Sequence, residues 1–379
     1  MRALAAAALL SVTLAACGSD SPSSRSDPQA RGPAGAPSPF SDGSFPSAGC
    51  VDSVAQEAEL WEVAAVAPPE MRRAPKPQDA GWLPGQLADL TVLDDGFAVA
   101  DLMLAEITRF DRDFTERKQW GRKGAGPGEF VAPVAVAKGP GGQVWVLDER
   151  RVSVFDRAGA FVRSFRLEKT GIDLAVDEAG RAYVAHVILP DFVRRDARWG
   201  VLVTMLDPDG GSPRELVRVT PADLEPPRFV LPGPTHVRVA ARGGRVAIAY
   251  EAAGVADVFR DGERIATVRA CMPDALAEAY ERQRRAAGDS QSYLMLVTDV
   301  FLDDDGTIHL IGPLKDQEGR YHIDRFSAAG EPLGSVVMPG TQIRMPNEVR
   351  FGASPAELVG FDVRGVVARF EVRSPQAGR

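Results

Sequence analysis

Reactive side chains and catalytic motifs are scarce in this sequence. Its 379 residues include 3 cysteines and 4 histidines, and no Gly-x-Ser-x-Gly, His-Glu-x-x-His or Cys-x-x-Cys motif occurs. The glycine-rich segment Gly124–Gly128 is not followed by Lys-Ser or Lys-Thr, so it lacks the residues of a phosphate-binding loop. The sequence therefore carries no signature of these nucleophilic, zinc-dependent or nucleotide-binding chemistries.

An excess of positive charge is also missing. The chain has 44 lysines and arginines against 52 aspartates and glutamates, a formal net charge of −8. A protein that neutralises phosphates needs lysines and arginines in excess on one face. We therefore expect no nucleic-acid partner.

The N-terminus has the pattern of an export signal. Met1-Arg2 precedes an apolar run, Ala3–Val12, which is too short to span a bilayer but fits the core of a signal peptide. The segment Leu14-Ala15-Ala16-Cys17 resembles a bacterial lipobox, which implies a signal peptide over 1–16 and a lipid, with palmitate among its acyl chains, on Cys17. The alternative is an ordinary signal peptide with a chance cysteine. Because Gly18 stands where an aspartate would favour inner-membrane retention, the resemblance implies the outer membrane.

The segment after the lipidation site is poor in residues that could form a core. Residues 18–49 are mostly Ser, Pro, Gly and Ala, a composition that predicts a disordered tether, and we assign 17–55 to the lipidated cysteine and this tether. The remaining cysteines are Cys50 and Cys271. An exported compartment permits a disulfide between them; the alternative is that Cys271 is a small buried residue.

The segment from Gly121 to Phe165 reads as one small antiparallel sheet. Four short apolar strands are separated by turns rich in Gly and Asp, which is typical of a propeller blade. Within it, Gly126–Phe130, Asp148 and Val154-Phe155-Asp156 closely resemble the NHL repeat. The resemblance implies a β-propeller, and related propellers include lyases and calcium-dependent lactonases.

The same order of strands and turns recurs along the chain. Further copies begin near Leu90, Asp173, Val237 and Val300, and the C-terminal strands around 358–372 are too few for a complete sheet. Pairing them with Leu60–Val66 gives a sixth blade that closes the ring and leaves no open edge. We predict an all-β fold, a six-bladed β-propeller over 56–374; seven blades is the alternative.

Long insertions gather at one end of the predicted ring, which we call the top. It carries the links between second and third strands and between blades; the opposite, hairpin end carries the tight turns after first and third strands. The top insertions are 189–198, 221–235, 272–293 and 313–320. Insertions in repeat proteins often mark the binding face. Residues 272–293 predict a helical insertion, whose arginines either meet an acidic partner or simply face solvent.

Polar residues recur where second strands reach the top. Alignment by turn glycines places Asp101, Asp148, His186 and Tyr250 at equivalent positions, which could hold a calcium or zinc ion or serve as acid and base. The alternative is that each aspartate caps a loop by accepting backbone N–H groups. No resident cofactor is otherwise indicated. With two basic residues of the glycine-rich loop, the candidate ligand-binding residues are Asp101, Arg122, Lys123, Asp148, His186 and Tyr250.

Three classes of function follow from these features. The first is a non-catalytic binding or scaffold lipoprotein that presents the top to a protein, peptide or glycan. The second is a cation-dependent hydrolase or lyase with its site at the channel mouth. The third is a purely structural envelope protein. A propeller serves many unrelated tasks, so the fold alone does not choose among them.

Overall fold

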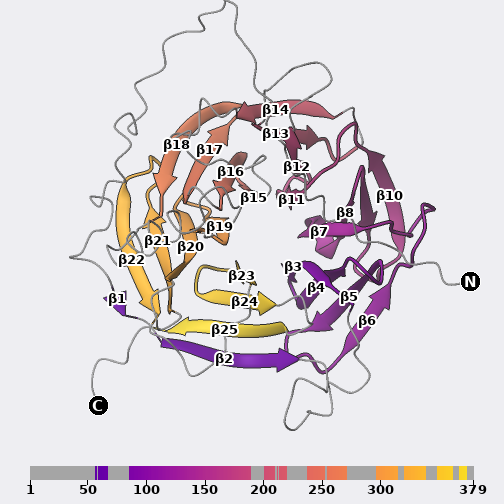
Figure 1. Ribbon diagram of the computed structural model, residues 1–379, viewed down its shortest axis with the longest axis horizontal. Coiled ribbons are helices and arrows are strands. Elements are labelled where there is room, and N and C mark those ends of the chain that lie inside the picture. The colour runs from indigo at the N-terminus through magenta and orange to yellow at the C-terminus, as the bar shows by residue number, and fades with distance from the viewer. Residues whose placement is uncertain are drawn as a thin grey trace, which may run out of the picture.

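The chain forms a ring of six four-stranded antiparallel sheets, seen face-on in the computed structural model of Figure 1. The structure describes residues 56–57, 59–66, 85–188, 200–209, 211, 213–219, 237–251, 254–270, 296–314, 320–338, 348–361 and 367–373. Cys17, Cys50, Cys271 and most of the predicted top insertions, including the helical insertion, lie outside these ranges. The prediction of an all-β, six-bladed propeller is confirmed.

Each blade runs from an inner strand at the channel to an outer strand at the rim (Figure 1). Blade 1 is β3 (Leu87–Leu93), β4 (Gly96–Asp101), β5 (Glu106–Asp111) and β6 (Arg117–Trp120). Blade 2 is β7 (Pro133–Lys138), β8 (Val144–Asp148), β9 (Arg151–Phe155) and β10 (Phe161–Arg166), with a 3-10 turn at Pro140–Gly142. Blade 3 is β11 (Asp173–Val176), β12 (Ala182–Ile188), β13 (Gly200–Leu206) and β14 (Arg214–Val219).

The other half of the ring is built in the same way. Blade 4 is β15 (Val237–Arg242), β16 (Arg245–Tyr250), β17 (Val255–Arg260) and β18 (Glu263–Arg269). Blade 5 is β19 (Asp299–Leu302), β20 (Ile308–Leu314), β21 (Arg320–Phe326) and β22 (Pro332–Met338), extended by β1 (Gln56–Glu57), which pairs parallel to β22. Blade 6 is β23 (Glu348–Phe351), β24 (Glu357–Phe361), β25 (Val367–Arg373) and β2 (Glu59–Val66).

The two ends of the described chain close the ring in one sheet. β2 pairs antiparallel with β25, with Leu60 opposite Val372 and Val66 opposite Val367. The N-terminal strand thus occupies the outer position that β25 would otherwise leave as an open edge. The predicted closure is confirmed.

Burial explains why some strands are continuously apolar and others are not. Every residue of β4 and of β8 is buried, because both faces of a second strand pack against neighbouring blades. The outer strand β10 is mostly exposed. Each pair of adjacent blades shares one apolar cluster, and six such clusters complete the circle.

Two features differ from the sequence-based expectation or add to it. The sequence predicts a top insertion over 313–320, but β20 extends to Leu314 and β21 begins at Arg320, with Pro313 paired to Tyr321. The link between β20 and β21 at the top is therefore shorter than predicted. Among the described residues, no helix is both long and apolar enough to cross a membrane.

Candidate functional site in the central channel

Asp101 holds the top of blade 1 together. Its carboxylate accepts the backbone N–H groups of Gly85, Gln86, Met103 and Leu104 at 2.6–3.1 Å. The side chain is buried, and these four bonds join the entry to β3 with the turn after β4. Asp101 therefore acts as a loop cap.

Asp148 has the same role in blade 2. Its carboxylate accepts the N–H groups of Val131 and Ala132, at 2.9 and 2.6 Å, and pairs with Arg151 at 2.8 Å. Arg151 also donates to the carbonyl of Glu129 at 2.6 Å. The glycine-rich loop is thus fastened to the end of β8 by its own blade.

His186 and Tyr250 are both buried. The Nδ1 of His186 lies 3.1 Å from the carbonyl of Thr170 and the Nε2 lies 2.8 Å from the hydroxyl of Thr204. A carbonyl only accepts, so Nδ1 carries the proton and Nε2 accepts from Thr204. Burial lowers the pKa of His186, partly offset by the bond to Thr170, which favours the neutral ring. Tyr250 is also buried, at the end of β16.

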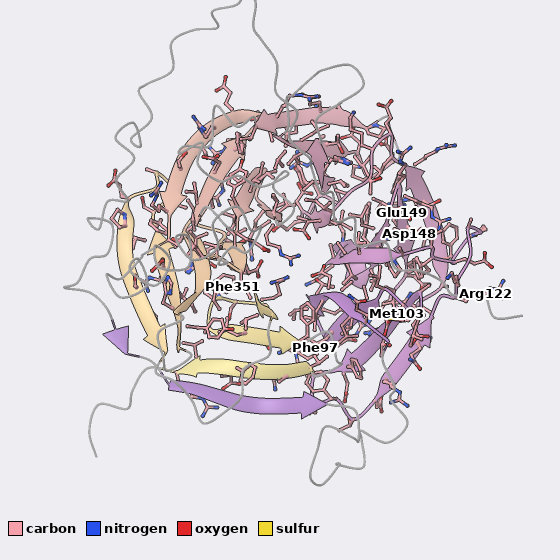
Figure 2. The ribbon with its side chains drawn as sticks, in the orientation of Figure 1. Phe97, Met103, Arg122, Asp148, Glu149 and Phe351 are labelled. Atoms are coloured by element: carbon pink, nitrogen blue, oxygen red, sulfur yellow. The ribbon has the colours of Figure 1, made fainter. Side chains whose placement is uncertain are left out.

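The two basic candidates of the glycine-rich loop are exposed to solvent. The side chain of Arg122 is 79% exposed and pairs with Glu129 at 2.7 Å, and Figure 2 shows it at the periphery of the ring. Lys123 is also exposed. Glu129 accepts the N–H of Gly126 at 2.9 Å, so the loop folds on its own side chains.

The six candidates therefore do not form one site. Asp101, Asp148 and His186 each have separate partners in separate blades. Within the described ranges, no three His, Cys, Asp or Glu side chains are grouped so as to hold a metal ion. The top-face binding hypothesis remains a prediction, because most of the insertions that motivated it lie outside the described residues.

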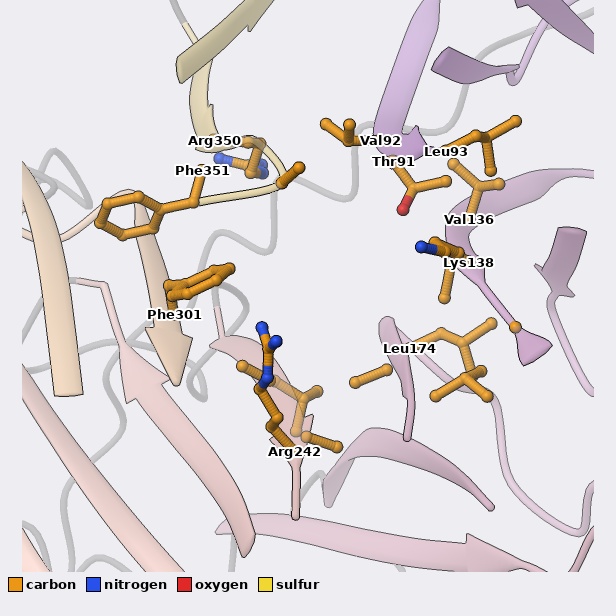
Figure 3. A pocket seen from close by; sticks show the side chains of 18 of the residues that line it. Thr91, Val92, Leu93, Val136, Lys138, Leu174, Arg242, Phe301, Arg350 and Phe351 are labelled. Atoms are coloured by element: carbon orange, nitrogen blue, oxygen red, sulfur yellow. The ribbon is translucent and has the colours of Figure 1, made fainter. Parts of the chain in front are cut away.

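The described residues instead enclose a cavity of about 720 Å³ in the channel (Figure 3). Its walls come from the inner strands of all six blades, and its lining extends to the turns after them, at Asp94, Pro140 and Glu178. The cavity therefore lies toward the hairpin end of the ring, opposite to the end that the sequence favoured. None of the six predicted ligand residues is part of its described lining.

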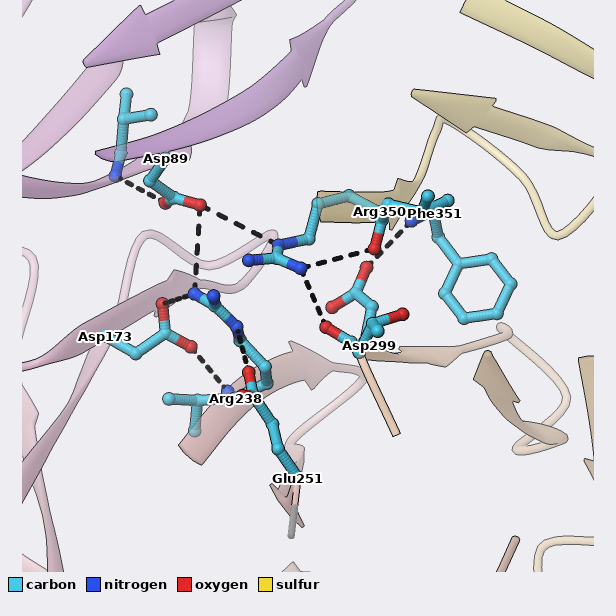
Figure 4. Close-up of polar contacts among 11 residues, drawn as sticks. Asp89, Asp173, Arg238, Glu251, Asp299, Arg350 and Phe351 are labelled. Carbon is cyan, nitrogen blue, oxygen red and sulfur yellow. Dashed lines mark hydrogen bonds and ion pairs between the residues drawn. The ribbon is translucent and has the colours of Figure 1, made fainter. Parts of the chain in front are cut away.

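A network of charged side chains lies at the inner end of the cavity (Figure 4). Arg238 is central to it: its Nε lies 2.8 Å from Glu251, and its Nη1 lies 3.6 Å from Asp173 and 3.9 Å from Asp89. Arg350 places its Nε 3.9 Å from the same oxygen of Asp89. The pairs with Asp89 and Asp173 are longer than hydrogen bonds, so the carboxylates are held near the arginines without close contact.

Burial dominates the electrostatics of this network. Desolvation raises the pKa of Asp89, although Arg238 and Arg350 oppose the rise. Desolvation raises the pKa of Asp173 to about 7, opposed by Arg238 and reinforced by Asp89. The pKa of Asp299 is raised to about 6 for the same reason. Such perturbed carboxyls in a cavity are a feature of binding and catalytic sites.

The outer part of the cavity combines an aromatic wall with paired charges. The rings of Phe301 and Phe351 lie 5.7 Å apart, and the Arg242 guanidinium lies 5.6 Å from the Phe301 ring. Arg242 also pairs with Asp304 at 2.6 Å, and Lys138 pairs with Asp94. The cations at the mouth thus have acidic partners of their own.

The sequence contained a signal for this network that pattern reading did not use. Asp173 and Arg238 belong to short apolar runs that the sequence analysis places at the start of a blade, and Asp299 directly precedes a third such run. Arg350 lies in β23, a strand that the sequence analysis does not predict. A charge inside an apolar strand is costly unless it has a partner. These charges therefore predict a polar channel once the strands are placed at the centre of a ring.

Comparison with known proteins supports the fold and no finer assignment. No family model matches, and no curated protein matches. A solved structure of a member of the DUF4221 family from Bacteroides vulgatus is similar, with a TM-score of 0.50 and 11% identity over 84% of this chain and 99% of that one. Kuenenia stuttgartiensis hydrazine synthase has a TM-score of 0.45 and 14% identity over 73% of each chain. The chain is a six-bladed β-propeller, and the NHL pattern of blade 2 remains a resemblance.

Proposed function

We propose that this chain is a lipoprotein of the bacterial cell envelope whose propeller is a non-catalytic binding module, with its ligand held in the channel cavity. The signal-like N-terminus and Cys17 support the location. The cavity of about 720 Å³ supports binding, because small-molecule sites are commonly of this size.

The charged inner end of the cavity is the observation that carries the proposal. Replacing buried ion pairs by apolar side chains often leaves stability unchanged or increases it. Charged residues such as Asp89, Asp173 and Arg238 are therefore not the only way to fill the centre of a stable ring. A ligand that uses these charges accounts for them better than a purely structural ring, whose channel could be filled with apolar side chains.

The hydrolase or lyase alternative has no comparable support. Asp101 and Asp148 already accept backbone N–H groups, and both ring nitrogens of His186 are engaged. Binding of a protein, peptide or glycan partner by the top face remains a separate hypothesis.

Blocking the cavity tests the binding function. Thr91 lines the cavity (Figure 3), so Thr91→Trp should fill part of it. We expect a small molecule that co-purifies with the wild type, detected by mass spectrometry of the denatured protein, to be lost from this variant. Arg117→Trp, on the exposed face of β6, is the matched control and should retain it. Equal amounts in all three proteins, or none in the wild type, would contradict the proposal.

Replacing the predicted lipid acceptor tests the location. Because the diacylglycerol would be attached to the thiol, Cys17→Ser should move the protein from the membrane fraction to the soluble fraction. The measurement is fractionation of the bacterial envelope followed by immunoblotting. A variant that stays in the membrane fraction would show that Cys17 is not the anchor.

A further inference from the structure

Hydrogen bonds between inner strands set a common register at the inner end of the cavity. In three pairs of adjacent blades, an inner-strand aspartate accepts a backbone N–H of the next inner strand at 2.7–2.9 Å. The pairs are Asp89 with Val136, Asp173 with Val239, and Asp299 with Phe351. The residues that follow these positions, toward the hairpin end, form the next layer of the cavity wall.

This next layer, which we call the middle layer, contains one large side chain. It consists of the residues two positions after each aspartate and one position after each donor, and all six line the cavity. Five of them are small: Thr91, Ala137, Ala175, Ala240 and Gly352. The sixth is Phe301. The small residues leave open space, and Phe301 gives that space an aromatic wall (Figure 3).

Two neighbouring rings hold the Phe301 ring in place. Its centre lies 5.7 Å from the Phe351 ring and 6.1 Å from the His309 ring, which it meets edge to face. The Nε2 of His309 lies 2.7 Å from the carboxylate of Asp303, which fixes the imidazole in turn. Phe301 is nevertheless only half-buried. The ring is therefore pre-organised, and part of it is available to a ligand in the channel.

The charged groups at both ends of the cavity already have partners of opposite charge. At the inner end, the guanidinium of Arg238 lies near Asp89 and Asp173. At the mouth, Lys138 and Arg242 each pair with an acidic side chain. Neither end therefore requires a charged ligand, and a neutral molecule with hydrogen-bonding groups is sufficient.

We propose that the cavity binds a neutral aromatic compound whose ring packs against Phe301 in the middle layer. Aromatic pairs gain from contact between the positive edge of one ring and the negative face of the other, in addition to the burial of apolar area. The Arg242 guanidinium lies 5.6 Å from the Phe301 ring, so it would also attract the π-face of a ligand beside that ring. A polar substituent of the ligand would point toward the charged inner end. This inference rests on the proposed function, because it names the ligand class of the same cavity.

A saccharide is the main alternative, because the C–H groups of a sugar ring also pack on the negative face of an aromatic ring. The hydroxyl groups of a sugar need hydrogen-bond partners around the whole ring. Of the six residues of the middle layer, Thr91 alone has a polar side chain. A hydroxyl buried without a partner costs free energy. An aromatic ring, which needs no partners at its edge, therefore fits this layer better.

Benzamide and cyclohexanecarboxamide test this inference, because they share the carboxamide and differ in whether the ring is aromatic. By NMR titration of the wild type, we expect benzamide to bind about fivefold more tightly than cyclohexanecarboxamide. Phe301→Leu keeps an apolar side chain, and should weaken benzamide binding about fivefold and leave the affinity for cyclohexanecarboxamide unchanged. Phe161→Leu, which removes an exposed ring from the outer strand β10, is the matched control and should change neither affinity.

Ala240→Leu provides a second test that keeps Phe301, because the longer side chain would narrow the middle layer. We expect this variant to lose benzamide binding. The comparison of the two amides on the wild type needs no variant, so it decides the question even where a variant fails to fold. Equal affinity for the two amides, or benzamide binding that is unchanged in folded Phe301→Leu or Ala240→Leu, would overturn the inference. A co-purifying saccharide that is lost in Thr91→Trp would leave the proposed function intact and reject only the aromatic ligand.

Discussion

At the scale of single residues, position in the ring decides what each aspartate does. Asp101 and Asp148, at the ends of second strands, are surrounded by backbone N–H groups and serve as caps. Asp89 and Asp173, on inner strands, lie near the guanidinium of Arg238 in the channel. The same side chain therefore acts as a loop cap at the top and as part of a charged network at the centre.

The raised pKa of Asp173 predicts a pH-dependent effect of Asp173→Asn on stability. The folded-state pKa of about 7 exceeds the unfolded value near 3.8. Between these values the folded protein retains a proton that the unfolded chain releases, so this group makes stability fall as pH rises from about 4 to 7. Asn does not titrate. We expect the melting temperature of Asp173→Asn, relative to wild type, to increase from pH 5 to pH 8.

Asp305→Asn is the control for this prediction, because the pKa of Asp305 is shifted in the opposite direction. Backbone and hydroxyl hydrogen bonds from Thr307 lower the pKa of Asp305. Its removal should therefore not improve the relative melting temperature as pH rises. A constant difference between wild type and Asp173→Asn across this pH range would show that the Asp173 carboxyl titrates as it does in water.

At the scale of strands, more of the structure could be predicted from the sequence than at the scale of side chains. Continuous apolar runs such as Val144–Leu147 identify second strands because both of their faces are buried. The pairing of β2 with β25 could also be predicted, since a ring with too few C-terminal strands needs one from elsewhere. The two-residue strand β1 could not, because its parallel pairing with β22 depends on where the chain passes the finished ring.

The closing strand predicts how truncation affects stability. Deleting the chain through Val66 removes β2 and exposes the edge of β25, so we expect the melting temperature to fall by about 10 °C or more. The open edge should also promote association that increases with protein concentration, measurable by size-exclusion chromatography. Deletion of residues 18–49 is the matched control and should leave both properties unchanged. A truncation through Val66 that melts like the control would contradict the closure.

At the scale of the whole molecule, the ring predicted from the sequence is correct, but the cavity lies at its other end. Insertion length favoured the top, whereas the described cavity is lined by the turns of the hairpin end. Sequence patterns identify strands along the chain, but the charged network joins Asp89 to Arg238 and Arg350, about 150 and 260 residues away. Only closure of the ring brings these side chains together, so the site could not be predicted from local motifs.

The central hypothesis is that the channel cavity, and not the top face, holds the ligand of this propeller. Its most direct test is a crystal structure of the protein purified from its bacterial host without added ligand. We predict density for a bound organic molecule in the channel, in contact with Thr91 and with the charged side chains at the inner end of the cavity. Density for a bound molecule only at the top face, or a channel that holds only water, would contradict the hypothesis.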